Sequence, residues 1–504
     1  MLPSAGGDTW LSRAEDATLM TDAVYAAYLT FADWCDRHRS RLLLVGGPVY
    51  GLFLVAIGHL VLRRFPNSGD EYVYLYQATT LAAGRLTNPA PVVPAAFEFN
   101  YIVQQGPREF GSFPPGWPLA LALATFVHVP TWLVNPILAV VTLVVVWALA
   151  RELHGPRIGA LAAAIVAVSP FFIFNGASFF SHTFCGLLLV FAAWCAARAD
   201  RRAVGGPLLA GASIGWAVLA RYFTGAVGGA AVAALLVSRT RPRHVRALAL
   251  LAAGALPFVF LLGAYDTVLS GSPWRLTTLE TTVSQWFAPG FALRGPDILA
   301  GQLLQFVLWT PPALLAVYVW FLGPRARLVD WMFVLVAVLL MFYVNRGGNQ
   351  YGPRFYYEGF LFLAIYASAR LFAHDRLADA PRATRRLFAA LAVSVAMLPV
   401  LFAVHARRMH TIVEERMDIY DRVADARLSH ALVLVGGRVG TARSMAARDL
   451  TRNGIERAGG VLYALDRGPA ENCALAAAHP GRAIFRYVWD RERRAGQLVR
   501  VRCD

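Results

Sequence analysis

The chain is organised around repeated apolar runs, each long enough to cross a lipid bilayer. A bilayer core of about 30 Å requires roughly 20 mostly apolar residues in a helix. The first run spans residues 42–62, and ten more follow before residue 404. The pattern predicts an all-α polytopic membrane domain over residues 42–404, with later spans near 132–150, 157–174, 182–198, 206–220, 223–238, 247–268, 298–320, 328–344, 356–373 and 387–404.

Residues 63–131 form a long insertion between the first two runs. Within it, the apolar segment 116–130 is bounded by prolines. If that segment crossed the bilayer, all later arginine clusters would change sides. If it lies in the interface, clusters such as Arg151 with Arg157 all face the cytoplasm, where short loops concentrate arginine. We therefore expect an interfacial helix inside a first external loop.

Eleven spans place the two ends of the chain on opposite sides of the membrane. Arginines before residue 42 indicate a cytoplasmic N-terminus. Residues 1–41 are expected to be a cytoplasmic amphipathic segment, helical near 15–36. Acidic residues interrupt this segment, which excludes a cleavable signal peptide. We expect a multi-pass protein of the bacterial inner membrane with its C-terminus in the periplasm.

Residues 405–504 differ in composition from the membrane part. Apolar stretches with strand character alternate with two helical stretches. The strands are expected at 431–435, 460–465, 483–489 and 497–503, and the helices near 441–450 and 469–478. This pattern predicts a small periplasmic α/β domain. It contains Cys473 and Cys503. The sequence is compatible with a disulfide between them and with two unpaired thiols.

Composition supports the membrane interpretation and removes one class of partner. Of 504 residues, 57% are hydrophobic and 15% are charged, whereas soluble domains carry about 25% charged residues. The net charge of +16 comes from 47 basic residues, all arginine. Because these arginines fill short gaps between apolar runs, they report orientation. We expect no nucleic-acid partner.

Adjacent carboxylates lie just beyond the first span, at Asp70 and Glu71. Acidic residues favour helix N-termini, so a solvated helix cap is one interpretation. The helix that follows is rich in tyrosine and is expected to lie on the membrane surface. The second interpretation is therefore a catalytic acid that faces a lipid substrate.

A glycine-rich segment, NRGGNQYGPRFYYE at 345–358, supplies positive charge where external loops otherwise hold little. It contains Arg346, Tyr351 and Arg354. Arginine binds phosphate in a bidentate manner, although snorkelling arginines in a loop are the alternative. Arg354, Tyr351 and the externally placed Arg221 are our candidate ligands for a phosphate group.

The segment FNGASFFSHTF at 174–184 places His182 at the outer end of an apolar run. A lone histidine in such a position is more often structural, but it can also titrate near neutrality or bind a metal ion. We keep His182 as a candidate catalytic residue. No CxxC or similar metal-binding spacing occurs, so the sequence predicts no cofactor, with a divalent cation as the alternative.

Three pieces, SGDEYVYLYQATTLAAGRL, FPPGWPLALA and YGPRFYYEGFLFLA, occur in this order along the chain. Together they resemble the polyprenyl-phosphate-sugar-dependent glycosyltransferases of the GT-C fold. The most similar group is the bacterial dolichyl-phosphate-mannose–protein mannosyltransferase-like family, which includes the lipid A aminoarabinose transferases. The resemblance covers the whole membrane part, including the interfacial helix in the first external loop.

The resemblance implies a reaction and assigns residues to it. A sugar would pass from a polyprenyl phosphate to a lipid, glycan or protein acceptor on the periplasmic face, with inversion at the anomeric carbon. Asp70 matches the family's first acid, a general base or acceptor-orienting residue, and Glu71 is its usual neighbour. Arg354 falls in the stretch that neutralises the donor phosphate.

The chain also departs from the family. Many members carry a second acid in a pattern like LTDMP, where this chain has FSHTF with His182. The resemblance therefore predicts neither a metal site nor a second catalytic carboxylate at this position. The alternative function is a secondary transporter or lipid flippase, which more often shows two related halves and ionisable residues at mid-membrane. Neither feature is visible in the sequence.

Overall fold

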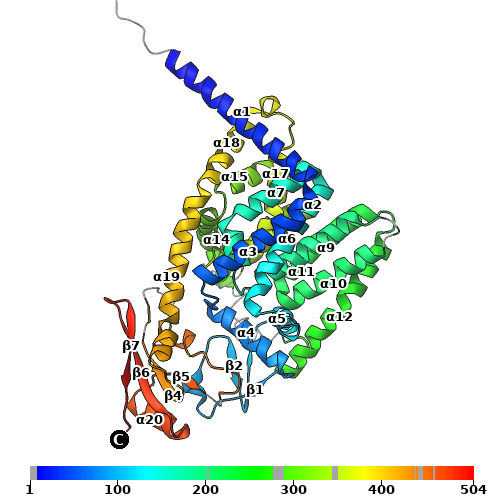
Figure 1. The fold of residues 1–504 in the computed structure, drawn as a ribbon. Coiled ribbons are helices and arrows are strands. Elements are labelled where there is room, and N and C mark those ends of the chain that lie inside the picture. The colour runs from blue at the N-terminus through cyan, green and yellow to red at the C-terminus, as the bar shows by residue number, and fades with distance from the viewer. Residues whose placement is uncertain are drawn as a thin grey trace, which may run out of the picture.

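The computed structural model describes residues 8–200, 202, 204–275, 289–342, 350–437, 439–440, 446–457 and 460–503. Figure 1 shows a bundle of helices with a small sheet at one end. The long helix α19 (Leu398–Asp425) runs from the bundle down to that sheet (Figure 1). The domain boundary expected at residue 405 thus falls inside a continuous helix.

The bundle is built from apolar helices that follow the predicted runs. The first run is one continuous helical segment, Arg39–Val61, with π-helical turns at Leu42–Gly46 and Ile57–Val61 around α3 (Gly47–Ala56). The others are α6 (Thr131–His154), α7 (Pro156–Val168), α8 (Pro170–Gly176), α9 (His182–Arg198), α10 (Gly205–Ala220), α11 (Tyr222–Thr240), α12 (His244–Ser270), α14 (Pro289–Trp309), α15 (Ala313–Phe321), α16 (Met332–Met341), α17 (Tyr357–Leu371) and α18 (Arg382–Ala396).

Four helices among the described residues are long and apolar enough to cross a membrane, or up to seven if each bent pair of helices counts as one span. The four are Arg39–Val61, Thr131–His154, Tyr222–Thr240 and His244–Ser270. Shorter apolar helices include α9 and α10. The count of eleven spans and the sidedness of the chain remain predictions.

Three of the expected spans are bent, which the apolar pattern did not predict. The run 298–320 is divided into α14 and α15, which meet at 118°, and 157–174 is divided into α7 and α8, which meet at 70°. A third bend of 40° separates α18 from α19. Prolines stand at these breaks, at Pro312, Pro170 and Pro399. Proline has no N–H to donate and clashes with the preceding turn, so the helix cannot continue straight.

The first external loop carries its own small structure. It opens with α4 (Gly69–Ala82) and continues into an antiparallel sheet in the order β1-β3-β2, made of Asn88–Pro89, Arg108–Gly111 and Ile102–Gln105. It ends with α5 (Gly116–Phe126), which has 11 residues. At 1.5 Å per residue this helix is about 16 Å long, about half the hydrocarbon thickness, which favours the interfacial placement.

The C-terminal part is a four-stranded sheet in the order β5-β4-β6-β7. The strands are β4 (Ala431–Val435), β5 (Val461–Leu465), β6 (Ala483–Asp490) and β7 (Ala495–Arg500), and β7 alone is antiparallel to its neighbour. Helix α20 (Pro469–Ala478) links β5 to β6. The predicted small α/β fold is confirmed. Of the helix expected at 441–450, residues 441–445 lie outside the described residues, and Ala447–Asp449 form a 3-10 turn.

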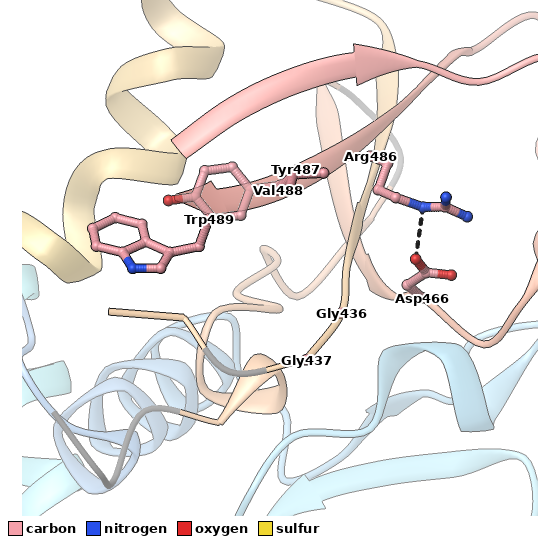
Figure 2. Close-up of a pocket in the computed structure, with 7 residues that line it drawn as sticks. All are labelled: Gly436, Gly437, Asp466, Arg486, Tyr487, Val488 and Trp489. Carbon is pink, nitrogen blue, oxygen red and sulfur yellow. Dashed lines mark ion pairs between the residues drawn. The ribbon is translucent and has the colours of Figure 1, made fainter. Parts of the chain in front are cut away.

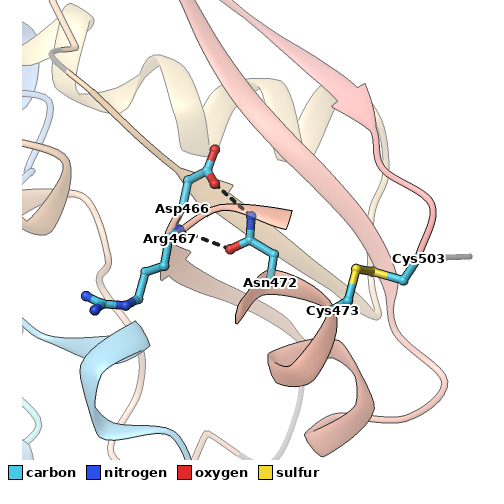
Figure 3. Close-up of a disulfide and its surroundings, with 5 residues drawn as sticks. All are labelled: Asp466, Arg467, Asn472, Cys473 and Cys503. Carbon is cyan, nitrogen blue, oxygen red and sulfur yellow. Dashed lines mark hydrogen bonds between the residues drawn. A yellow bond between two sulfur atoms is a disulfide. The ribbon is translucent and has the colours of Figure 1, made fainter. Parts of the chain in front are cut away.

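A disulfide closes the C-terminal domain. Cys473 in α20 is bonded to Cys503, three residues after β7 ends (Figure 3). Asn472, the neighbour of Cys473, is buried and accepts a hydrogen bond from Arg467 N at 3.0 Å, which fixes the start of α20 to the end of β5 (Figure 3). The bond decides between the two states that the sequence left open for these thiols.

The C-terminal domain packs against the first external loop. Tyr72 Oη donates to the carbonyl oxygen of Asn453 at 2.5 Å, and Arg457 forms an ion pair with the buried Glu109 at 2.5 Å. Ala96 and Phe97 of the loop also pack into the apolar cluster beneath β4 and β5. The domain therefore supports α4, the helix that begins with the two candidate acids.

The N-terminal helix α1 (Asp8–Arg37) lies at the opposite end of the molecule (Figure 1). Its Asp33 pairs with Arg157 at 2.6 Å, and Asp36 pairs with Arg151. Helix formation over 15–36 was expected, but these pairs were not. They hold α1 against the arginine clusters that the sequence places in the cytoplasm.

Candidate active site

Helix α4 begins with a defined cap, and Asp70 is not the capping residue. Ser68 occupies the N-cap position in an extended conformation, and its Oγ accepts a hydrogen bond from Glu71 N at 3.1 Å. A serine oxygen at this position satisfies one of the free N–H groups of the first turn. The helix-cap interpretation of Asp70 is therefore wrong, because Ser68 already fulfils that role.

Asp70 instead forms an ion pair with Arg354. The Nη2 atom of Arg354 donates to Asp70 Oδ2 at 2.5 Å. Arg354 opens a single 3-10 turn, Arg354–Tyr356, and its guanidinium carbon lies 4.2 Å from the centre of the Phe180 ring. The Arg354 side chain is 5% exposed and the Asp70 side chain 18%. Asp70 is thus the member of the pair that an incoming molecule can reach.

Glu71 points to a different neighbour from Asp70. It is fully buried, and its Oε1 accepts a hydrogen bond from Phe179 N at 2.9 Å. Burial raises the pKa of Glu71 to about 7, although the Phe179 N–H and the nearby Arg354 act in the opposite direction. Glu71 therefore holds the segment before His182 in place and does not present a carboxylate to solvent.

His182 and Arg221 meet at a carboxylate that the sequence did not identify as a candidate, Glu358. Arg221 Nε lies 3.1 Å and His182 Nδ1 lies 3.4 Å from Glu358 Oε1. Arg221 Nη1 is also 3.4 Å from His182 Nε2 and from Ser181 Oγ. The side chains of His182 and Glu358 are almost completely buried, whereas that of Arg221 is 16% exposed.

Aromatic rings join the two charged groups into one site. The guanidinium carbons of Arg354 and Arg221 lie 5.3 and 5.5 Å from the centre of the same ring, Phe355. Tyr74 extends from α4 to Ser181, with their oxygens 3.3 Å apart. The structure thus brings Asp70, Arg354, His182 and Arg221 together, although they come from four separate segments of the chain.

Tyr351, a candidate phosphate ligand from the sequence, is buried. Its side chain is completely buried, and its carbonyl oxygen accepts a hydrogen bond from Asn175 Nδ2 at 3.0 Å. A ligand in the open part of the site would not contact this side chain directly. Arg346, the other arginine of this segment, lies outside the described residues.

The FPPGW segment forms a wall of the site by close packing. A methyl group on Gly116 would lie 2.6 Å from Ala220 N, so the start of α5 presses against the end of α10 just before Arg221. Trp117 Nε1 donates to the carbonyl oxygen of Phe179 at 2.8 Å. The segment therefore fixes both the turn at Arg221 and the loop that precedes His182.

The described residues contain no group of three or more histidine, cysteine, aspartate or glutamate side chains arranged to hold a metal ion. At the candidate site, the Asp70 carboxylate already pairs with Arg354, and the Glu358 carboxylate with Arg221. Each acid therefore has a cation from the chain itself.

A separate cavity of about 450 Å³ lies in the C-terminal domain, lined by Gly436, Gly437, Asp466, Arg486, Tyr487, Val488 and Trp489 (Figure 2). Its acid, Asp466, pairs with Arg486 at 2.7 Å and accepts from Asn472 Nδ2 at 2.7 Å. Gly436 lies so close that a methyl group on it would be 3.0 Å from Asp466 Cβ. The polar groups of this cavity serve to fix the turns after β4 and β5.

Comparison with known proteins agrees with this architecture. Residues 114–263 match the family described as dolichyl-phosphate-mannose-protein mannosyltransferase. The chain also resembles the crystal structure of ArnT from Cupriavidus metallidurans bound to undecaprenyl phosphate, with 12% sequence identity, coverage of 88% of this chain and 92% of that chain, and a TM-score of 0.53. No curated protein matches the chain significantly.

A weaker likeness, with a TM-score of 0.41, is to the archaeal oligosaccharyltransferase AglB from Archaeoglobus fulgidus in complex with an inhibitory peptide and a dolichol-phosphate. It has 14% identity and covers 74% of this chain and 56% of that one. This score is too low to establish a common fold. The likeness to ArnT spans nearly the whole of both chains and confirms the resemblance expected from the sequence: this protein has a membrane fold of the GT-C type.

Proposed function

We propose that this protein is a membrane glycosyltransferase that moves a sugar from a polyprenyl-phosphate donor to an acceptor at the external face of the membrane. The observation that carries the proposal is the Asp70–Arg354 ion pair beside the second cation, Arg221, within a GT-C fold. The structural relative ArnT is bound to undecaprenyl phosphate, which supports the same class of lipid carrier here.

The two partly exposed groups of the site are the Asp70 carboxylate and the Arg221 guanidinium. They suit the acceptor and the leaving phosphate of such a reaction. The Asp70 carboxylate orients the acceptor hydroxyl or amine and takes its proton as the nucleophile attacks the anomeric carbon. The bond from that carbon to the phosphate oxygen breaks, and the electron pair leaves with the polyprenyl phosphate. The arginines stabilise the charge that develops on this phosphate. The ion pair with Arg354 holds the Asp70 carboxylate in one orientation during the reaction.

The membrane fold supplies what a soluble enzyme lacks. A polyprenyl chain is soluble only in the bilayer. The protein must therefore bind its phosphate at the membrane surface, where the apolar helices end. The site residues lie where α4, α9, α11 and α17 begin. The phosphate can therefore enter the site while the chain remains in lipid. The sugar and the acceptor are expected to be components of the bacterial cell envelope.

The proposal is tested with the purified full-length protein in lipid nanodiscs. A panel of radiolabelled undecaprenyl-phosphate sugars is offered with an envelope extract as acceptor, and label in extract components is measured. We expect transfer from at least one donor, lost on heating and in Asp70→Asn. Translocation of the donor across liposomes without transfer would instead support a flippase and reject the proposal.

A further inference from the structure

Glu358 is the buried acid for which the proposed reaction has no obvious use. It lies in the first turn of α17 and is completely excluded from solvent. An isolated buried carboxylate is costly unless it is paired. Its neighbours are Arg221, at 3.1 Å from Oε1, and His182, at 3.4 Å from the same oxygen. The carboxylate of Glu358 is therefore the counter-charge of the Arg221 guanidinium.

The three side chains form a closed ring of contacts. Arg221 contacts Glu358, Glu358 contacts His182, and His182 Nε2 returns to Arg221 Nη1 at 3.4 Å. A neutral imidazole with its proton on Nδ1 fits this ring, because it turns N–H toward the carboxylate and a lone pair toward the guanidinium. Nε2 of His182 thus faces the Arg221 guanidinium, and Nδ1 approaches the Glu358 carboxylate without forming a hydrogen bond to it.

The exposed fractions of the three side chains show which of them can contact a ligand. Glu358 is 0% and His182 1% exposed, whereas Arg221 is 16% exposed. The Asp70–Arg354 pair has the opposite arrangement, with the acid more exposed than the arginine. One pair therefore offers a carboxylate to the open site and the other offers a guanidinium, and in each the partner is held inside.

We propose that Glu358 is a positioning residue that holds the Arg221 guanidinium, with His182, toward the phosphate of the lipid donor. This inference rests on the proposed glycosyltransferase function and assigns the buried carboxylate a role that acts only through Arg221. Arg354 then serves mainly to hold Asp70, and Arg221 serves the departing phosphate. The direction of the guanidinium matters because its planar set of donors binds phosphate only in a defined orientation.

The test is a double-mutant cycle read as binding of undecaprenyl phosphate to the full-length protein in detergent, by native mass spectrometry. Arg221→Met and Glu358→Gln should each raise the Kd at least about tenfold. The double variant should bind no more weakly than Arg221→Met alone, since Glu358 has nothing left to position. Additive losses, or unchanged affinity in Glu358→Gln, would overturn the assignment.

Glu109→Gln is the matched control. Glu109 is equally buried and also pairs with an arginine, Arg457, but it does so between β3 and the C-terminal domain. It should leave the Kd for undecaprenyl phosphate within about twofold. A rise in Kd as large as that in Glu358→Gln would show that loss of any buried ion pair weakens binding, and would overturn the positioning role.

A second variant covers the case in which Glu358→Gln does not fold. Glu358→Asp keeps the charge but withdraws the carboxylate by one methylene, so an intermediate rise in Kd is expected, and unchanged affinity would contradict the proposal. Failure of the proposed function has its own signature, because the wild-type protein would then transfer no sugar from any donor in the nanodisc assay, whether or not it binds undecaprenyl phosphate. Binding by the wild type with equal binding by Glu358→Asp and Glu358→Gln rejects only the role of Glu358.

Discussion

Arg354 and Asp70 are separated by 284 residues in the sequence, yet Nη2 of the first lies 2.5 Å from Oδ2 of the second. The pair joins the helix that follows the first span to the turn that precedes α17. Because the guanidinium is almost completely buried and the carboxylate is partly open, the arginine acts as a fixed support for the acid. Catalytic and stability effects at Asp70 are consequently linked, and experiments must separate them.

Replacing Asp70 with asparagine keeps its shape but removes both its charge and its ability to take a proton. We expect turnover in the transfer assay to fall about 10²–10⁴-fold, the usual contribution of a general base. The change also leaves the buried Arg354 without its counter-charge. Thermal unfolding should therefore be measured alongside activity, in the same nanodisc preparation.

Asp421→Asn is the control for that substitution. Asp421 pairs with Arg63 at 3.0 Å through a side chain that is 42% exposed, and it contacts none of the four charged groups of the candidate site in the described ion pairs. Exposed pairs contribute about 0–1 kcal/mol, so turnover should stay near that of the wild type. Near-normal transfer by Asp70→Asn would leave Asp70 as a structural partner of Arg354 only.

The buried Glu71 makes the stability of the protein depend on pH. Its pKa is raised to about 7 by burial, from an ordinary value of 4.5. The folded protein thus keeps this proton over a range where the unfolded chain has lost it. The stabilisation is fully present below about pH 4.5 and is lost as the pH rises through about 7.

Glu71→Gln removes this titration. We expect the Tm of the wild type to fall between pH 5 and pH 8, and the Tm of the variant to fall less over the same range, as measured by thermal unfolding in detergent. The glutamine can still accept the hydrogen bond from Phe179 N. Equal slopes of Tm against pH in the two proteins would show that Glu71 is not the group responsible.

The disulfide predicts both a stability effect and a compartment. Cys473 and Cys503 are 30 positions apart in the sequence. Closing a loop of this length raises the free energy of the unfolded chain by about 3–4 kcal/mol. Disulfides persist in the periplasm and are rare in the cytosol. Cys473→Ser should lower the Tm of the C-terminal domain without changing the affinity for undecaprenyl phosphate.

Thiol labelling tests the disulfide directly, without a measurement of topology. In protein isolated from cells without reductant, Cys473 and Cys503 should react with a maleimide only after reduction, as read by peptide mass spectrometry. Labelling of both before reduction would contradict the bond and would remove the support it gives to a periplasmic C-terminus.

The sequence identified most of the charged groups of the site but not how they pair. Asp70, His182, Arg221 and Arg354 were recognised because a polar residue at the end of an apolar run is conspicuous. Glu358 was not predicted, because it stands inside the apolar run YYEGFLFLA and no cation near it in the sequence indicates its partner. Which acid meets which cation depends on helix packing, and no local pattern in the sequence encodes it.

The helix bends show a different limit. The proline pair at Pro311 and Pro312 was visible in the sequence, but hydropathy alone gave one span over 298–320. Apolar content reports that a segment prefers lipid, whereas the backbone hydrogen bonds decide whether it can continue straight. A related limit appears at α4, where a helix cap was one of two interpretations of Asp70, whereas Ser68 two residues earlier provides the cap.

Gly352 controls the approach of the segment that carries Arg354. It has a φ of +83°, and its carbonyl oxygen accepts a hydrogen bond from Arg354 N at 2.8 Å. A methyl group on it would lie 2.8 Å from Phe171 Cδ2 and 2.9 Å from Trp309 Cγ. Both rings are buried. Neither can retreat without disturbing the packing of the bundle, so an added methyl must move the turn that begins with Arg354.

Gly352→Ala should therefore damage the site more than the backbone change alone explains. The matched control is Gly271→Ala at the end of α12, where φ is +82° and no atom lies within 4 Å of the added methyl group. Both variants carry the left-handed penalty of about 1–2 kcal/mol, but only Gly352→Ala also clashes. We expect a fall in transfer of at least about tenfold in Gly352→Ala and near-normal transfer in Gly271→Ala, at comparable yields of folded protein. Equal activity in the two variants would mean that the close packing around Gly352 does not hold Arg354 in place, and that the Asp70–Arg354 pair tolerates movement of the turn.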